Sequence, residues 1–133
     1  MRNLRRLQFE IGILRKIFGF QNISYPSDGS WIKISNYMLP QTRCVYNFRF
    51  TSILVMIPDE YGSVGVSLSY IDKDLRIRRG SKFEKLPHTH DGKYNKEGYQ
   101  WLCFEVSNKL VGLLDFINTL KLYFSDPLSY QHL

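Results

Sequence analysis

The most constraining feature of the chain is the run VYNFRFTSILVMI, which occupies residues 45–57 and ends against Pro58. It is rich in β-branched and aromatic side chains, and a proline-bounded run of this composition favours a β-strand. Its last five residues are apolar throughout, which is typical of a strand buried on both faces. We therefore expect a sheet with this strand near its centre.

Two further runs predict the neighbours of this strand. Residues 31–37 form a short, partly alternating run that Pro40 breaks, and residues 64–70 alternate after the turn at residues 58–62. The connections between the runs are short, and short connections join strands that lie antiparallel. The three runs together predict an antiparallel β-meander.

Both ends of the chain carry helical periodicity. Near the N-terminus, apolar side chains recur at intervals of three and four residues: Leu4, Leu7, Ile11, Leu14 and Phe18. This spacing predicts an amphipathic helix over residues 3–18 that ends at Gly19, and Gly12 inside it suggests that another element approaches closely. A second apolar face over residues 112–124 predicts a helix that ends before Pro127.

These elements predict one α+β domain over residues 1–133, an antiparallel β-meander flanked by an N-terminal helix and a C-terminal helix. At 44% hydrophobic and 15% aromatic residues, the chain can bury one core. No apolar run approaches the roughly 20 residues of a membrane span, and two cysteines are too few for a disulfide framework. We therefore expect a soluble, cytoplasmic protein with reduced thiols and no membrane partner.

Periodicity fades between residues 72 and 98, where we expect a long loop. Residues 86–104, LPHTHDGKYNKEGYQWLCF, carry His88, His90 and Cys103. A polar, turn-rich stretch that ends in an apolar run is typical of a flap folded over a site. Cys103 is the candidate nucleophile, and the two imidazoles are the groups that could help to ionise it.

The same residues allow other interpretations. Cys103 could be a small buried hydrophobe inside its apolar run. His88, His90, Cys44 and Cys103 could bind zinc, although their spacing fits no usual zinc pattern. The chain has no phosphate-binding glycine loop and no paired catalytic carboxylates, so we expect no cofactor.

The net charge of +6, from 18 basic and 12 acidic residues, favours acidic partners. The basic residues form two clusters, one of Arg2, Arg5, Arg6, Arg15 and Lys16, and one of Arg76, Arg78, Arg79, Lys82 and Lys85. Each cluster is either a solvated face or a docking surface. Aromatic and basic side chains also interleave over residues 46–50, where core packing is favoured over the stacking of bases.

The order of these pieces resembles the ubiquitin-conjugating enzyme fold, in particular its compact bacterial relatives from conjugation and antiphage-signalling operons. A basic N-terminal helix precedes a meander, and residues 57–61, IPDEY, are similar to that family's proline- and tyrosine-bearing turn. Pro-His at residues 87–88 opens the flap where the eukaryotic enzymes have His-Pro-Asn, and Gly98 then leads to Cys103. Residues 125–128, SDPL, are similar to the family's Asp-Pro-Leu ending, so the resemblance covers nearly the whole chain.

The resemblance implies a cysteine-dependent transferase. Cys103 would accept a ubiquitin-like protein, or another protein C-terminus, as a thioester from an activating enzyme and pass it to an amine of an acceptor protein. His88, His90 or Asn95 would take the place of the absent His-Pro-Asn asparagine as donor to the developing oxyanion. The basic N-terminal helix would dock to an acidic activating enzyme.

Two other functions remain open. A conjugating-enzyme-like fold without activity would be a protein-binding module, and it would have a buried Cys103 that resists alkylation. A nucleic-acid-binding domain would use the two basic clusters, and its affinity would fall steeply with salt. Of the three functions, nucleic-acid binding is the least favoured by the sequence.

Overall fold

The computed structural model describes residues 1–41, 44–103 and 112–130. Its helices are α1 (Leu4–Phe18) and α2 (Leu113–Ser125), with short 3-10 turns η1 (Phe20–Asn22) and η2 (Asn95–Glu97). Its strands are β1 (Ile23–Ser24), β2 (Trp31–Met38), β3 (Phe50–Met56), β4 (Leu68–Asp72), β5 (Ile77–Arg79), β6 (Lys82–Glu84), β7 (Thr89–His90) and β8 (Tyr99–Leu102).

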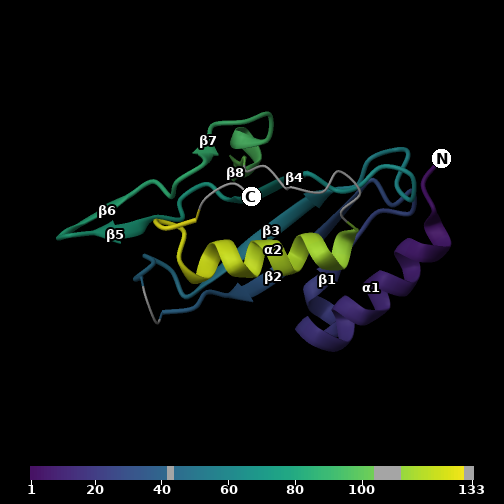
Figure 1. The fold of residues 1–133 in the computed structure, drawn as a ribbon, viewed down its shortest axis with the longest axis horizontal. Coiled ribbons are helices and arrows are strands. Elements are labelled where there is room, and N and C mark those ends of the chain that lie inside the picture. The colour runs from purple at the N-terminus through teal and green to yellow at the C-terminus, as the bar shows by residue number, and fades with distance from the viewer. Residues whose placement is uncertain (42–43, 104–111, 131–133) are drawn as a thin grey trace.

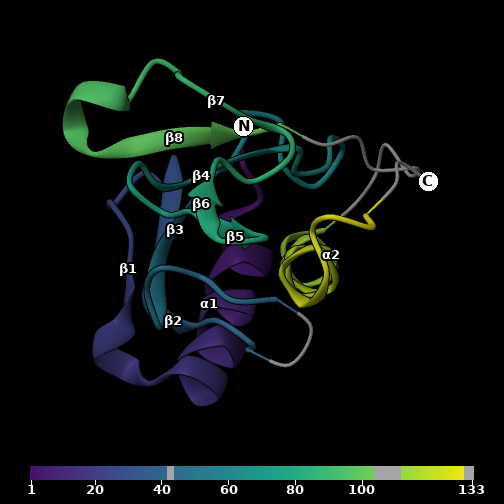
Figure 2. The same cartoon turned by 90° about the vertical axis from the view of Figure 1, so that its left-hand side faces the viewer.

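One antiparallel sheet of six strands, in the order β1-β2-β3-β4-β8-β7, forms the centre of the molecule. Both helices cover the same face of this sheet, and β5 and β6 form a separate hairpin that stands out from the body (Figures 1 and 2). The expected fold class, an α+β arrangement with an antiparallel sheet between an N-terminal and a C-terminal helix, is confirmed.

Helix α1 confirms the predicted N-terminal helix. The side chain of Asn3 caps it by accepting the Arg6 N–H at 3.1 Å, and Gly19 ends it. Its apolar stripe, Leu7, Ile11 and Leu14, is buried. The expected close approach at Gly12 is wrong, because a Cβ atom at this position would meet nothing within 4 Å.

The main sheet alternates between a fully buried face and a half-buried face. Ile34, Ile53 and Ile71 lie side by side across three strands on the face beneath the helices, and each is fully buried. The opposite side, called here the helix-free face, carries Leu54, Met56, Tyr70 and Trp101. Leu54 and Met56 are only half-buried, so the expected burial of this strand on both faces is not complete.

Two predicted strands begin later than expected. The strand expected over residues 45–57 starts at Phe50, because the segment before it is held elsewhere: the Tyr46 hydroxyl donates to the Phe124 carbonyl at 2.5 Å, and Tyr46 pairs with Ile77. The strand expected over residues 64–70 starts at Leu68, because residues 61–64 form a turn closed by backbone bonds to the Glu60 carbonyl.

The long loop expected over residues 72–98 is wrong in its greater part. This stretch contains β5, β6, β7 and η2, and the apolar end of the expected flap forms β8, between β4 and β7. The sequence does not predict the β5–β6 hairpin, because only Ile77 among its strand residues is buried and its sequence shows no apolar alternation. Gly80 makes its tight turn with a left-handed backbone, φ 62°.

Helix α2 confirms the predicted C-terminal helix. A buried polar network joins α1 to the start of α2. The Tyr61 hydroxyl accepts the Leu113 N–H and donates to the Glu10 carboxylate, with both bonds 2.7 Å long. The Arg6 guanidinium lies 3.5 Å from the same carboxylate and 4.9 Å from the Tyr61 ring centre. The charge of Glu10 is therefore balanced although its side chain is buried. Neither of the described helices is long and apolar enough to cross a membrane.

Candidate active site

Cys103 and His88 are neighbours across the β7–β8 pair. Thr89 opposes Leu102 in this pair, and His90 opposes Trp101. One residue further along, the Cys103 N–H donates to the His88 carbonyl at 2.7 Å. Cys103 is partly exposed at this point, just after the end of β8. The alternative in which Cys103 is a fully buried hydrophobe therefore does not hold.

His88 has an unusual backbone conformation and an aromatic surrounding. Its φ angle is 67°, in the left-handed region that non-glycine residues enter at a cost of about 1–2 kcal/mol. Its ring centre lies 6.4 Å from that of Tyr123 and 6.3 Å from that of Tyr130. The Tyr123 hydroxyl also donates to the carbonyl of Pro87, so the last turns of α2 hold the start of β7 in place.

The two imidazoles turn to different faces of the sheet. The His90 ring lies 5.7 Å from the Trp101 ring, on the helix-free face. The His88 ring instead packs against Tyr123 of α2, on the face that the helices cover. The structure thus joins the backbones of His88 and Cys103, while the two imidazole rings belong to separate aromatic groups.

The loop between β7 and β8 covers the helix-free face. Tyr94 stacks edge-on against Tyr70 with 5.0 Å between ring centres, and a Cβ atom at Gly92 would come within 3.0 Å of the Trp101 Cβ. Asn95, which was expected to be able to fold in as an oxyanion donor, instead donates its amide to Asp91 at 3.4 Å. This polar loop therefore packs on the sheet, and Asn95 is engaged within the loop itself.

Cys44 has a structural surrounding. Its sulfur lies 4.0 Å from the carbonyls of Phe124 and Ser125 at the end of α2, and burial raises the pKa of its thiol. The zinc alternative required Cys44 to join Cys103 and the histidines. Within the described ranges, no three His, Cys, Asp or Glu side chains are grouped so that they could hold a metal ion.

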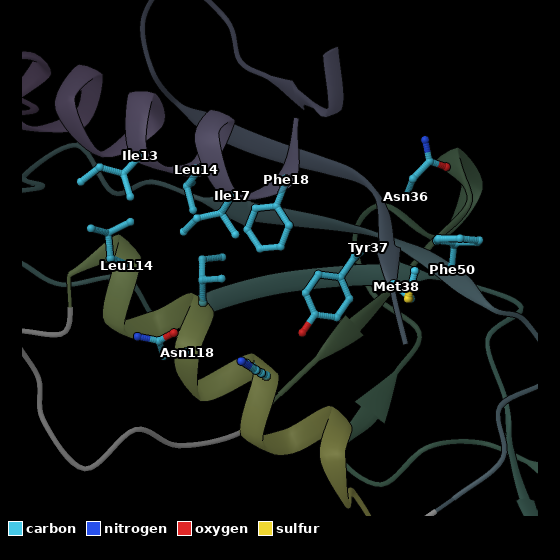
Figure 3. A pocket seen from close by; sticks show the side chains of 12 residues that line it. Ile13, Leu14, Ile17, Phe18, Asn36, Tyr37, Met38, Phe50, Leu114 and Asn118 are labelled. Atoms are coloured by element: carbon cyan, nitrogen blue, oxygen red, sulfur yellow. The ribbon is translucent and has the colours of Figure 1, made fainter. Parts of the chain in front are cut away.

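A groove of about 630 Å³ opens between the two helices (Figure 3). The helices are joined near their N-terminal ends, where Arg6 lies over the Tyr61 ring and the Tyr61 hydroxyl accepts the Leu113 N–H. The groove is lined by Ile13, Leu14, Ile17, Phe18, Asn36, Tyr37, Met38, Phe50, Leu114, Ile117, Asn118 and Lys121, and thus by none of the three predicted catalytic residues. The sequence signal for it was the apolar pair Ile13 and Ile17, which lies off the predicted buried stripe of α1.

The two basic clusters differ in how many of their side chains pair with other groups of the protein. In the N-terminal cluster, Arg2 pairs with Asp59 at 2.7 Å, and Arg15 lies over the Phe20 ring at 4.1 Å. The second cluster lies on and beside the β5–β6 hairpin, where its lysines and most of its arginines are exposed. The hairpin is therefore the more available basic surface.

Comparisons of the chain with protein-family models, with curated proteins and with solved structures return no match. The geometry around Cys103 is therefore the observation on which a function can be based.

Proposed function

We propose that the protein is a cysteine-dependent acyl transferase of the ubiquitin-conjugating type, with Cys103 as the acceptor. The observation that carries the proposal is a partly exposed cysteine whose backbone N–H donates to the carbonyl of His88, a residue with a left-handed backbone. Strained backbone persists where the surrounding structure enforces it, and such residues cluster at functional sites. Here Tyr123 enforces it by binding the carbonyl that precedes His88.

The order of elements also supports this type of transferase. Helix α1 precedes the antiparallel meander β1–β4, the cysteine follows a further strand of the same sheet, and α2 comes after it. This is the order in which the resembling family places its helix, meander, reactive cysteine and following helix. The proposed setting is a cytoplasmic conjugation or antiphage pathway of a bacterium.

The chemistry requires two acyl transfers and no cofactor. In the first, the Cys103 thiolate attacks the carbonyl carbon of a donor thioester, a new C–S bond forms, and the thiolate of the activating enzyme leaves. In the second, an acceptor amine attacks that carbonyl carbon, an amide forms, and the Cys103 thiolate leaves while the amine loses a proton. We assign to His88, whose backbone is bonded to that of Cys103, the role of taking the thiol proton before the first transfer and returning it after the second.

The partners follow from this chemistry. A ubiquitin-like protein, or another protein C-terminus, is the acyl donor, an activating enzyme presents it, and a protein amine receives it. Arg5, Arg6 and Lys16 are the exposed basic residues of α1. Because Arg6 pairs with Glu10, Arg5 and Lys16 are the residues that an acidic activating enzyme would meet.

Alkylation separates an available thiol from a covered one. The chain is treated with a low concentration of iodoacetamide and mapped by mass spectrometry, with the buried Cys44 as the internal control. We expect Cys103 to react first and Cys44 only after denaturation, because burial raises the pKa of the Cys44 thiol. His88→Asn, which keeps a residue that tolerates a left-handed backbone, should slow the labelling of Cys103 near pH 7.

The transferase itself is tested by the adduct in the native cell. Extracts prepared without reductant should contain a covalent adduct of the wild-type protein that a thiol reagent releases. The adduct should be absent from Cys103→Ala and present in Cys44→Ala. An adduct that survives in Cys103→Ala, or a Cys103 that labels no faster than Cys44, would end the proposal.

A second candidate function is a protein-binding module without catalysis, which the groove between α1 and α2 favours. Ile17 and Met38 are exposed beside this groove, and exposed apolar side chains around a concave surface mark interaction sites. On this hypothesis, Ile17→Glu weakens the capture of a partner, and Cys103→Ala leaves that capture unchanged. The two proposals therefore give opposite results for the cysteine variant.

A further inference from the structure

The β5–β6 hairpin is a small basic ribbon that the fold holds away from its body. It lies at the end of the molecule opposite α1 (Figure 1). Residues 76–85 contain five basic residues and a single acidic one, Glu84. Apart from Ile77, all residues of its two strands are exposed, including Phe83 at 48%.

The base of the ribbon is braced, so its direction is fixed. The Arg78 N–H donates to the Val45 carbonyl at 2.9 Å, and the Asn47 N–H donates to the Arg76 carbonyl at 3.1 Å. The Asn47 side chain accepts the Arg76 N–H at 2.7 Å and donates to the Asp74 carbonyl at 2.8 Å. Three hydrogen bonds therefore tie the ribbon to the segment before β3, and a fourth holds the residue Asp74 just before it.

The register of the ribbon places like charges against each other. Arg79 opposes Lys82 at the pair next to the turn, and like charges directly opposite each other in a hairpin are destabilising. Glu84 offsets this only in part, with a carboxylate oxygen 3.6 Å from the Arg79 guanidinium. Among the described residues, no carboxylate lies within ion-pair distance of Arg78 or Lys82. An anionic partner at the tip would remove this repulsion.

Cations occur on both faces of the ribbon, and this favours nucleic acid over an acidic protein. Arg79 and Lys82 share one face, and Arg78 shares the opposite face with Phe83. A protein interface has an apolar centre from which charged residues are depleted. A ribbon charged on both sides fits instead between two walls of phosphate, with an apolar side chain available for base edges.

The dimensions fit duplex DNA. Three paired residues at about 3.4 Å each make a ribbon about 10 Å long. The major groove of B-form DNA is about 8.5 Å deep and about 12 Å wide and admits a two-stranded β-ribbon. We propose that the β5–β6 hairpin binds double-stranded DNA by entering the major groove tip-first, with Arg78, Arg79 and Lys82 on the flanking phosphates. This site is separate from Cys103 and does not depend on the transferase proposal.

The test measures fluorescence anisotropy of a fluorescein-labelled DNA duplex of about 20 base pairs over a series of salt concentrations. The full chain is compared with Arg78→Gln/Lys82→Gln and with the control Arg5→Gln/Lys16→Gln, which removes the same charge from α1. We expect the hairpin variant to lower the slope of log affinity against log salt by about 1.8, since each phosphate contact contributes about 0.9. Its affinity at low salt should fall about tenfold or more, whereas the control should bind like the wild type.

Three results would overturn this inference. Equal losses in the two double variants would show that general charge, and not the hairpin, attracts the duplex. Tighter binding of the single strand than of the duplex would exclude insertion into a groove, because an exposed Phe83 would then be stacking on bases. Binding of labelled poly-glutamate as tightly as the duplex would assign the ribbon to an acidic protein.

Discussion

Replacing Tyr61 by phenylalanine tests the network that joins the two helices. The lost hydroxyl binds the carboxylate of Glu10, whose side chain is in a residue only 5% exposed, and a hydrogen bond to a charged group contributes about 1.5–3 kcal/mol. The same hydroxyl accepts the buried Leu113 N–H, and an unpaired buried donor costs about 1–3 kcal/mol. Because Arg6 still lies beside Glu10, we expect a total loss of about 2–4 kcal/mol in the free energy of unfolding.

Urea denaturation followed by circular dichroism measures this loss. The midpoint should fall while the slope of free energy against urea stays that of the wild type, because the change affects the folded state. Tyr94→Phe is the matched control, since among the described residues the Tyr94 hydroxyl has no hydrogen-bond partner and its ring packs at the surface of the sheet. A Tyr61→Phe loss as small as that of the control, below about 0.5 kcal/mol, would refute the network.

Alkaline pH gives a second measurement on the same variant. Burial raises the pKa of Tyr61 to about 12, from the ordinary 10.0. The unfolded chain loses this proton near pH 10 while the folded chain keeps it, so the contribution is complete below pH 10 and is lost as the pH rises to 12. A shift of this size corresponds to roughly 2–3 kcal/mol. Tyr61→Phe should therefore show a shallower decline of unfolding free energy between pH 10 and pH 12, and an identical decline would contradict the assignment.

Three further substitutions are tested in the same urea assay, one expected to raise and two expected to lower the free energy of unfolding. Gly12→Ala should stabilise the chain by about 0.5–1 kcal/mol, because α1 gains helix propensity and the new Cβ meets nothing within 4 Å. Gly29→Ala should destabilise it by about 1–3 kcal/mol, because φ is 69° and the Cβ would come within 2.8 Å of Leu7. Phe116→Ala, in a residue that is 1% exposed, should cost about 3–5 kcal/mol, and an unchanged midpoint would remove α2 from the core.

The sequence predicts the helices and the β2 strand well because their signals are local. The stripe of α1 follows from the spacing of its leucines and isoleucines, and Gly19 ends the helix where the pattern stops. Helix α2 begins and ends within one residue of its predicted bounds for the same reason. Strand β2 shows inward alternation that Pro40 limits. In each case the burial pattern has a single period along a continuous segment.

The missed elements depend on partners that are distant in the chain. Residues 45–49 have the composition of a strand. However, the Tyr46 hydroxyl binds the Phe124 carbonyl and its backbone pairs with Ile77, while Phe48 is exposed. The expected core packing of the aromatics in residues 46–50 therefore holds for Tyr46 and is wrong for Phe48 and Phe50, which are exposed. Tyr46 is buried because it contacts α2 and the hairpin, and these distant contacts leave no signal in the local sequence pattern.

The candidate site, too, was predictable in its residue types but not in the contacts that depend on distant parts of the chain. The residues themselves indicated that Cys103 and a histidine could meet if the polar stretch folded back. Which histidine would pair with Cys103 through the backbone depended on the β7–β8 register, and the face to which its ring turns depended on the left-handed backbone at His88. That backbone in turn depends on Tyr123, which lies 35 positions later in the sequence and binds the Pro87 carbonyl. Spacing alone could not have chosen between His88 and His90.

The last turns of α2 support both proposed surfaces. The final carbonyls of a helix have no partner within it, and in α2 the Phe124 carbonyl accepts the Tyr46 hydroxyl, one residue from the Val45 carbonyl that braces the hairpin. One position earlier, Tyr123 fixes the start of β7 and so the position of His88. Leu114, Ile117, Asn118 and Lys121 of α2 line the groove. A partner seated in that groove would contact the helix whose end positions His88, whereas the hairpin would still be held by its own bonds to Asn47.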